Sequence, residues 1–207
     1  AVYVIDSNAL TVSDCNFTEN TALRGGGLFA LTSPQLLVTD CDFTANRAYG
    51  SASYRLDPND PNSLILDENF IAQGGGIFAF ASISAIEHCR ITNNTAITSG
   101  GGIYIAGLHE DQNSPKIFNC LIAKNKAGAD GGGISANWFA DVLISNCTVS
   151  ENIVSNIDGS GGGLYVSYEG RADVENSIFW GNTGLVGSQM AVGSGDASYP
   201  LPGYIKV

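Results

Sequence analysis

Apolar and polar positions repeat along this chain in one short pattern, which occurs six times. In each copy an apolar residue stands three positions before a central residue, another stands two positions after it, and an asparagine stands five positions after it. The central residues are Cys15, Cys41, Cys89, Cys120, Cys147 and Ser177. The asparagines are Asn20, Asn46, Asn94, Asn125, Asn152 and Asn182. This regular self-similarity indicates a repeat protein.

The alternation of side chains predicts that each copy bends. Residues two apart in a strand share a face and residues three apart do not, so the apolar residue before the central position belongs to a different strand. The two residues between them are polar in most copies, which favours a corner there, and a second corner is expected at the asparagine. Glycine triplets such as residues 100–102 then precede a third strand with apolar first and third residues.

Three strands per coil, stacked coil on coil, predict an all-β fold, a parallel β-helix (β-solenoid) of about six to seven coils. We expect residues 1–207 to form a single domain. The first and last stretches match strands from the middle of a coil, and neither carries a polar cap. We therefore expect this domain to be a segment of a longer solenoid, or copies of the chain to stack end to end.

The copies resemble the right-handed, single-stranded parallel β-helix repeats of bacterial surface and secreted proteins. Those proteins include pectate-lyase-like chains and polymorphic outer-membrane proteins, whose repeats carry Phe-x-x-Asn and Gly-Gly-Ala-type motifs. The glycine triplets followed by Leu or Ile stand here where those proteins place Gly-Gly-Ala. The resemblance implies a right-handed coil and an extracellular or cell-surface location, but this scaffold carries lyases, hydrolases, adhesins and inert stalks alike.

The charge balance argues against two classes of partner. Asp and Glu number 20 against 9 Lys and Arg, which gives a net charge of −11. Nucleic acids and anionic membrane surfaces are bound by clustered basic residues, which this chain lacks. It also has no apolar run of the roughly 20 residues that a membrane-spanning helix needs.

The outward positions of the third strand form an aromatic row that could bind a ligand. The candidate carbohydrate- or partner-binding residues are Phe29, Phe78, Tyr104 and Tyr165. Large exposed apolar patches on monomers usually mark contacts. One expectation is that the long insertion at residues 47–73 folds over this row as a lid. The alternative is an open aromatic platform for sugar rings.

The same insertion contains a sequence that is suited to a hard cation. Asp57, Asn59, Asp60 and Asn62 place oxygen ligands close together, as calcium requires. Because Asx-Pro pairs also form ordinary turns, a plain loop is the competing interpretation. Calcium is the one cofactor that the sequence suggests.

Two columns should run along the inside of the stacked coils. We expect the six asparagines to form a structural ladder, because an amide side chain satisfies the backbone groups that a corner leaves unpaired. The five cysteines should stack as buried free thiols. Disulfides would need a better geometry than in-register neighbours provide, and no Cys-x-x-Cys or His-rich motif indicates a metal.

The sequence thus favours an extracellular structural or adhesive module whose partners are neighbouring β-helix segments, copies of itself, or glycans. The alternative is a polysaccharide-binding or polysaccharide-degrading β-helix, which as an enzyme would be a lyase or a glycoside hydrolase. Catalysis needs converging acidic and basic groups, and the outward rows of the third strand offer aromatic and small residues instead.

Overall fold

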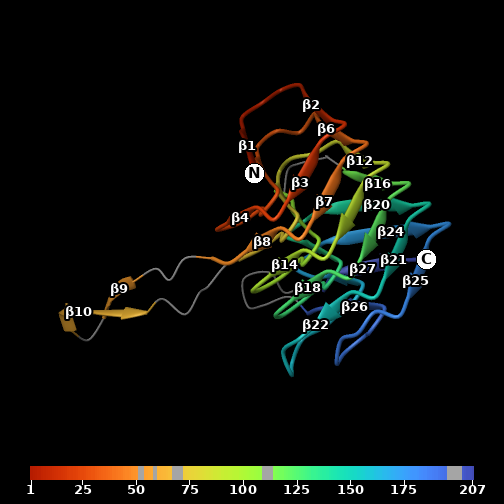
Figure 1. The fold of residues 1–207 in the computed structure, drawn as a ribbon. Helices are drawn as coiled ribbons and strands as arrows, with labels where there is room; N and C mark the ends of the chain where they lie inside the picture. The colour runs from red at the N-terminus through yellow and green to blue at the C-terminus, as the bar shows by residue number, and fades with distance from the viewer. Residues whose placement is uncertain (51–53, 58–59, 67–71, 109–113, 195–201) are drawn as a thin grey trace.

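The structure is a computed structural model that describes residues 1–50, 54–57, 60–66, 72–108, 114–194 and 202–207, with the backbone alone at 54–57 and 60–66. The described residues form strands joined by turns, stacked in coils along one axis (Figure 1). No helix in this part of the chain is long and apolar enough to cross a membrane.

In the described part of the chain four parallel sheets run along the stack, and each coil adds one strand to most of them. Sheet A contains β1 (Val2–Ile5), β5 (Leu28–Leu31), β11 (Ile77–Phe80), β15 (Ile103–Ala106), β19 (Ile134–Asn137), β23 (Leu164–Val166) and β26 (Met190–Val192). Sheet B contains β2 (Leu10–Ser13), β6 (Leu36–Thr39), β12 (Ala85–Glu87), β16 (Lys116–Phe118), β20 (Asp141–Ser145), β24 (Arg171–Glu175) and β27 (Tyr204–Lys206).

Sheet C contains β3 (Asn16–Thr18), β7 (Asp42–Thr44), β13 (Arg90–Thr92), β17 (Leu121–Ala123), β21 (Thr148–Ser150) and β25 (Ile178–Trp180). Sheet D contains the two-residue strands β4 (Thr21–Ala22), β8 (Arg47–Ala48), β14 (Thr95–Ala96), β18 (Lys126–Ala127) and β22 (Ile153–Val154). Sheets B, C and A are the three predicted strands of each coil. Sheet D is a fourth, short one, which lies between the asparagine and the glycine triplet.

The predicted all-β parallel β-helix is therefore confirmed. Every pairing among the four sheets is parallel and in register from coil to coil. Sheets A and B have seven strands and sheet C has six, in agreement with the expected number of coils.

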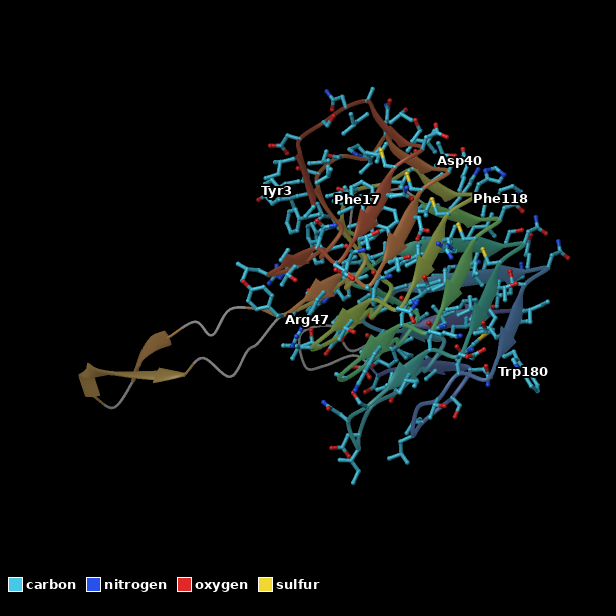
Figure 2. All side chains as sticks on the ribbon, viewed as in Figure 1. Tyr3, Phe17, Asp40, Arg47, Phe118 and Trp180 are labelled. Carbon is cyan, nitrogen blue, oxygen red and sulfur yellow. The ribbon has the colours of Figure 1, made fainter. Side chains whose placement is uncertain are left out.

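The polar residues between sheets B and C form the predicted corner. The residue immediately before each central position has a positive φ, between 47° and 54°. These residues are Asp14, Asp40, His88, Asn119, Asn146 and Asn176. Asp and Asn tolerate this left-handed conformation better than most residues do, which explains the polar pair in the repeat. Asp40 lies at one of these corners in Figure 2.

The glycine triplets are required by the close approach of successive coils. The first glycine of a triplet has a positive φ, as at Gly100 with φ 68°. At the second, a Cβ added to Gly101 would lie 2.4 Å from the carbonyl oxygen of Gly132 in the next coil. A side chain at this position would therefore push neighbouring coils apart.

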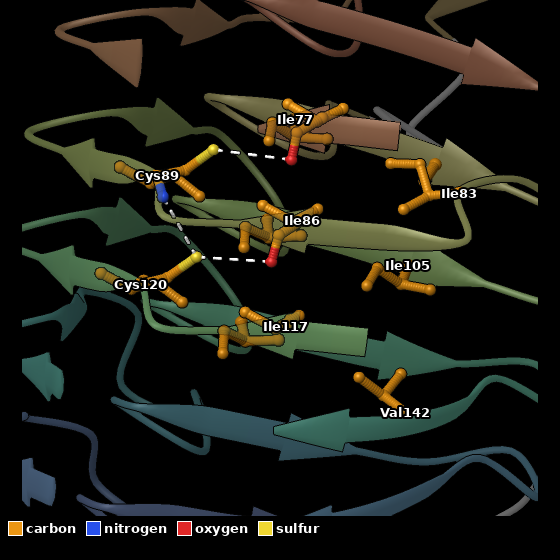
Figure 3. Close-up of a cluster of buried hydrophobic side chains, with 14 of the residues drawn as sticks. Ile77, Ile83, Ile86, Cys89, Ile105, Ile117, Cys120 and Val142 are labelled. Atoms are coloured by element: carbon orange, nitrogen blue, oxygen red, sulfur yellow. Dashed lines mark hydrogen bonds between the residues drawn. The ribbon is translucent and has the colours of Figure 1, made fainter. Parts of the chain in front are cut away.

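Inward-facing side chains of sheets A, B and C fill the interior of the stack. Aliphatic residues from successive coils, such as Ile86 and Ile117, lie above one another beside Cys89 and Cys120 (Figure 3). Because equivalent side chains pack on each other at every coil, the core is one continuous column.

The remaining strands lie in the long insertion. β9 (Tyr54–Asp57) and β10 (Asp60–Leu66) pair antiparallel as a hairpin, which Figure 1 draws apart from the coils. The side chains of this hairpin lie outside those that the structure describes, so the lid stays a prediction.

Candidate functional site

The asparagine column lies inside the corner between sheets C and D. The amide nitrogen Nδ2 of Asn125 donates to the carbonyl oxygen of Ile91 at 2.8 Å and to Oδ1 of Asn152 at 3.0 Å. Its own Oδ1 accepts hydrogen bonds from the backbone N–H and the Nδ2 of Asn94. Every side-chain hydrogen-bonding group of Asn125 thus has a partner, and the column joins each coil to the next.

The same bonds recur along the column, with different partners at its two ends. Oδ1 of Asn20 accepts from the N-terminal amine, and Nδ2 of Asn182 donates to Oε1 of Gln189. Asn46, Asn94, Asn125, Asn152 and Asn182 are buried, whereas Asn20 is half-buried. These residues hold the coils in register and are not accessible to a ligand.

The cysteine column runs in parallel inside the corner between sheets B and C. All five cysteines are free; Cys15 is half-buried and the other four are buried. Each sulfur donates to the carbonyl oxygen two residues earlier, as Cys89 does to Glu87 at 3.0 Å. Burial raises the pKa of the Cys41 thiol to about 11, and the neighbouring thiols and burial raise the pKa of Cys120. The thiols of Cys41 and Cys120 are therefore protonated at neutral pH.

The aromatic row lies on the outer face of sheet A, where its rings stack on one another. Successive ring centroids are 4.6 Å apart for Tyr3 and Phe29, 5.0 Å for Phe29 and Phe78, and 5.4 Å for Phe78 and Tyr104. Stacking of identical positions follows from the in-register pairing of the strands. The row ends at Ser135, which separates Tyr104 from Tyr165.

The structure gives the four aromatic candidates different accessibility. Phe78 and Tyr104 are each only 3% exposed, because they pack with Ala106, Phe29, Phe80 and Trp138. Phe29 and Tyr165 are half-buried. A sugar ring therefore cannot stack on Phe78 or Tyr104 in this conformation, and an open platform that uses all four rings is not present.

Polar groups continue the row beyond Tyr104. Nδ2 of Asn137 donates to Ser135 at 2.9 Å, and the hydroxyl of Ser167 donates to Oδ1 of Asn137 at 2.8 Å. Burial raises the pKa of Tyr104, and hydrogen bonds with Asn137 and Gln73 act in the opposite direction. This part of the face is a closed hydrogen-bonded network.

A second group of side chains lies at the corner between sheets A and B. Trp138 and Tyr168 occupy equivalent turns of successive coils, both with φ 52°, and their rings stack at 4.6 Å with an interplanar angle of 4°. The backbone N–H of Phe139 donates to the carbonyl of Tyr168 at 3.1 Å, which holds the two turns together. Both rings are half-buried and so keep part of their surface in contact with solvent.

Charged and aromatic groups surround an open depression next to this stacked pair. The depression has a volume of about 370 Å³ and is lined by Glu169, Gly170, Arg171, Pro202 and Tyr204. The guanidinium of Arg171 lies 5.4 Å from the centre of the Tyr204 ring.

Two carboxylates flank the Arg171 guanidinium. Its Nε lies 3.4 Å from Oδ1 of Asp173 and 3.8 Å from Oδ1 of Asp141. These carboxylates raise the pKa of Arg171, Asp173 most strongly. The carboxylate oxygens of Asp141 and Asp173, the N–H groups of Arg171 and the ring of Tyr204 thus lie close together. We call the stacked rings and the depression together the corner groove (Trp138, Tyr168, Glu169, Arg171, Tyr204).

The sequence pattern did not single out the corner groove. Trp138, Tyr168 and Glu169 lie at turn positions that do not repeat in every copy. Arg171 and Tyr204 begin β24 and β27, and they meet only because these two strands pair. The two adjacent aromatic turns, Trp138-Phe139 and Tyr168-Glu169, were the available signal.

The calcium prediction falls mainly outside what the structure describes. Asp57 ends β9, and Asp60 and Asn62 lie in β10, where the backbone alone is described; Asn59 lies outside the described residues. The backbones of Asp57 and Asp60 are paired across the hairpin. Calcium binding stays a prediction. Elsewhere, the described residues contain no group of three or more His, Cys, Asp or Glu side chains that could hold a metal ion.

A comparison with family models matches residues 1–197 to the family described as "Right handed beta helix region". No curated protein and no solved structure matches the chain. The match covers most of the chain and agrees with the predicted right-handed parallel β-helix.

Proposed function

Since the chain belongs to the right-handed β-helix family, we propose that it is an extracellular or cell-surface structural and adhesive module that binds glycans at the corner groove. The observation that carries the proposal is the groove itself. Tyr204, Arg171 and Glu169 line the depression, and the stacked rings of Trp138 and Tyr168 lie at the adjoining turns. Aromatic faces and charged hydrogen-bonding groups of this kind are what sugar-binding sites use to stack pyranose rings and to bond hydroxyls.

The charges of the groove favour a neutral glycan. Glu169, Asp141 and Asp173 lie around Arg171, and Lys206 is the strand neighbour of Asp173. Carboxylates thus outnumber cations here, and the whole chain carries a net charge of −11. A uronate or sialic acid would be repelled by this potential, whereas neutral hydroxyls can donate to the carboxylates. We therefore infer that the preferred ligands are uncharged hexose polymers.

The test is a glycan array with the whole chain, followed by affinity measurements on the best neutral oligosaccharide. Arg171→Ala and Tyr168→Ala should each weaken binding at least tenfold, about 1.4 kcal/mol. Arg90→Ala is the matched control, because Arg90 is also exposed and ion-paired, with Asp42 on sheet C, far from the groove. Equal binding by wild type and the groove variants, or a preference for uronates, would overturn the proposal.

Polysaccharide degradation is the alternative function. Asp141 and Asp173 both lie within 4 Å of one guanidinium, and two nearby carboxylates are what a glycoside hydrolase requires. Both are half-exposed partners of Arg171, so we propose binding without cleavage. Incubation with neutral glucans and with polyuronides distinguishes the two functions: new reducing ends, or unsaturated products that absorb in the ultraviolet, would establish an enzyme.

The same proposal includes neighbouring β-helix segments or further copies of the chain as partners. The last coil exposes a group of apolar side chains on and beyond the edge strand β25: Ile178, Trp180, Leu185 and Val186. Trp180 is 73% exposed and points outward in Figure 2. Apolar groups at the edge of a sheet favour association with another β-structure.

A further inference from the structure

The five cysteines form a column that has no role in the proposed function. Each sulfur donates to the carbonyl oxygen two residues earlier, and equivalent positions of successive coils are occupied by Cys15, Cys41, Cys89, Cys120 and Cys147. Figure 3 shows this arrangement for Cys89 and Cys120, where the backbone N–H of Cys89 donates to the sulfur of Cys120 at 3.5 Å. We call these residues the thiol column.

The geometry of the thiol column is unsuited to disulfides. Neighbouring parallel strands lie ~4.8 Å apart, and in-register side chains leave them in nearly parallel directions. A disulfide needs sulfurs about 2.05 Å apart and a dihedral angle near 90° about the S–S bond. Adjacent sulfurs would have to move toward each other and twist, against the packing of the core.

The same geometry suits a cation held by two sulfurs in a line. A metal–thiolate bond of about 2.3 Å gives a sulfur–metal–sulfur length of ~4.6 Å, which is close to the spacing of the coils. The bonds to the metal would run along the column and therefore roughly perpendicular to each Cβ–Sγ bond, an angle that bound thiolates commonly adopt. Soft thiolate ligands select soft cations such as copper(I).

We propose that the thiol column binds soft monovalent cations of the copper(I) and silver(I) class, one between each pair of adjacent sulfurs. Each ion has two ligands, so the site differs from the clusters of three or more side chains that are absent from the described residues.

The surroundings of the sulfurs favour a bound cation. The sulfur of Cys120 lies 3.2 Å from the carbonyl oxygen of Phe118 and 3.5 Å from that of Ile86. Cys41 and Cys147 have equivalent pairs of carbonyl oxygens. In the metal-free chain these carbonyl oxygens accept the thiol protons. A cation beside the sulfurs would replace those protons as the positive charge that the carbonyls face.

Charge balance is maintained at every step. Each ion displaces one thiol proton, so four ions in the four gaps between five sulfurs release four protons and leave the buried column neutral. Because the ions compete with protons, binding should tighten as the pH rises. Cys15 is half-buried and provides the accessible end of the column.

The stoichiometry of silver binding tests the proposal. The reduced chain is titrated with silver nitrate in chloride-free buffer, and the bound metal is counted after desalting. Wild type should bind four ions per chain. Cys147→Ser removes one end of the column and should leave three, whereas Cys120→Ser interrupts it and should leave two (Cys15–Cys41 and Cys41–Cys89).

Serine is accepted in this column, because Ser177 occupies the next coil and its hydroxyl accepts a hydrogen bond from the N–H of Cys147. Cys89→Ser also interrupts the column and provides a second variant with two expected ions. Circular dichroism checks that each variant is folded. If Cys120→Ser and Cys147→Ser bound the same number of ions, each thiol would act alone and the proposal would fail. Failure of the folded wild type to retain silver would also overturn it.

Discussion

Asn125 shows how one residue type can supply the hydrogen bonds that the corner between sheets C and D needs in every coil. Its amide donates twice and accepts twice, which matches the backbone groups and the neighbouring amides in the column. Aspartate has no donor, and it would bring a charge into a buried position. The repetition of asparagine is therefore explained by hydrogen-bonding capacity, without any contact to a ligand.

Replacement of Asn125 by alanine should lower the free energy of unfolding by about 1–3 kcal/mol, because it leaves buried polar groups without partners. The matched control is Asn20→Ala at the half-buried end of the column, where the loss should be smaller. Urea denaturation measures both. Equal losses of stability at the two positions would show that burial of the asparagine does not determine how much its hydrogen bonds contribute.

The Cys41 thiol makes stability depend on pH in the alkaline range. The pKa of Cys41 is raised from 9.0 to about 11 in the folded chain by burial, so its thiol ionises more readily in the unfolded chain. The folded state therefore holds more protons between these values, and the free energy of unfolding should fall as the pH rises from about 9 to 11. Cys41→Ser should show a shallower decline than wild type in urea denaturation over this range. Parallel curves for the two proteins would contradict the assignment.

Between sheet D and sheet A, the glycine triplet acts as an element of fixed geometry. Its backbone is approached so closely by the next coil that side chains are excluded, and its first residue turns the chain. The corner between sheets C and D is more tolerant, because Ala45 and Lys124 occupy it with φ 57° and 59°. Two corners with similar backbone conformations thus differ in the space around them.

This difference predicts losses of stability of different size for two glycine-to-alanine changes. In Gly101→Ala the new methyl group would meet the backbone of Gly132 and Lys126, at 2.4 and 2.5 Å, and should cost about 3 kcal/mol or more. In Gly181→Ala the nearest atom is 3.6 Å away, so only the left-handed backbone opposes it, at about 1–2 kcal/mol. Chemical denaturation should rank the variants in this order, and a larger loss at Gly181 would refute the argument.

The whole molecule is a stack in which each coil contacts its neighbours, so its stability depends on how well the outermost coils are covered. At the last coil, Ile178 and Trp180 lie on the outer face of the edge strand β25 and are 61% and 73% exposed. Their exposure supports association through this region. The acidic net charge opposes association of like copies, most strongly at low salt.

Sedimentation velocity should therefore show concentration-dependent self-association that increases with salt. Trp180→Lys should weaken it, because a charge would be placed in the apolar contact. Leu121→Lys is the control: Leu121 is on the same face of sheet C, 38% exposed, but on the interior strand β17. A monomer at all salt concentrations, or equal effects of the two variants, would argue against association through β25.

Most of the fold could be predicted from the sequence, because the same local chemistry recurs in every coil. The alternation of side chains along a strand predicts the corner before Cys120. The hydrogen bonds needed at the following corner predict an asparagine there, at Asn125. The lack of space for a side chain accounts for the glycines before Ile134. Each of these signals acts over a few residues, and repetition separates it from chance. Sheet D was missed because its strands are two residues long and lack an alternating pattern.

Only the tertiary structure decided which outward side chains are accessible. Phe78 and Tyr104 occupy outward positions in their strands, yet neighbouring rings and Trp138 bury them. The corner groove arises where β27 pairs with β24 and brings Tyr204 against Arg171. The burial of a side chain, and the meeting of side chains in one site, depend on contacts between coils. The sequence pattern of a single coil carries no information about those contacts.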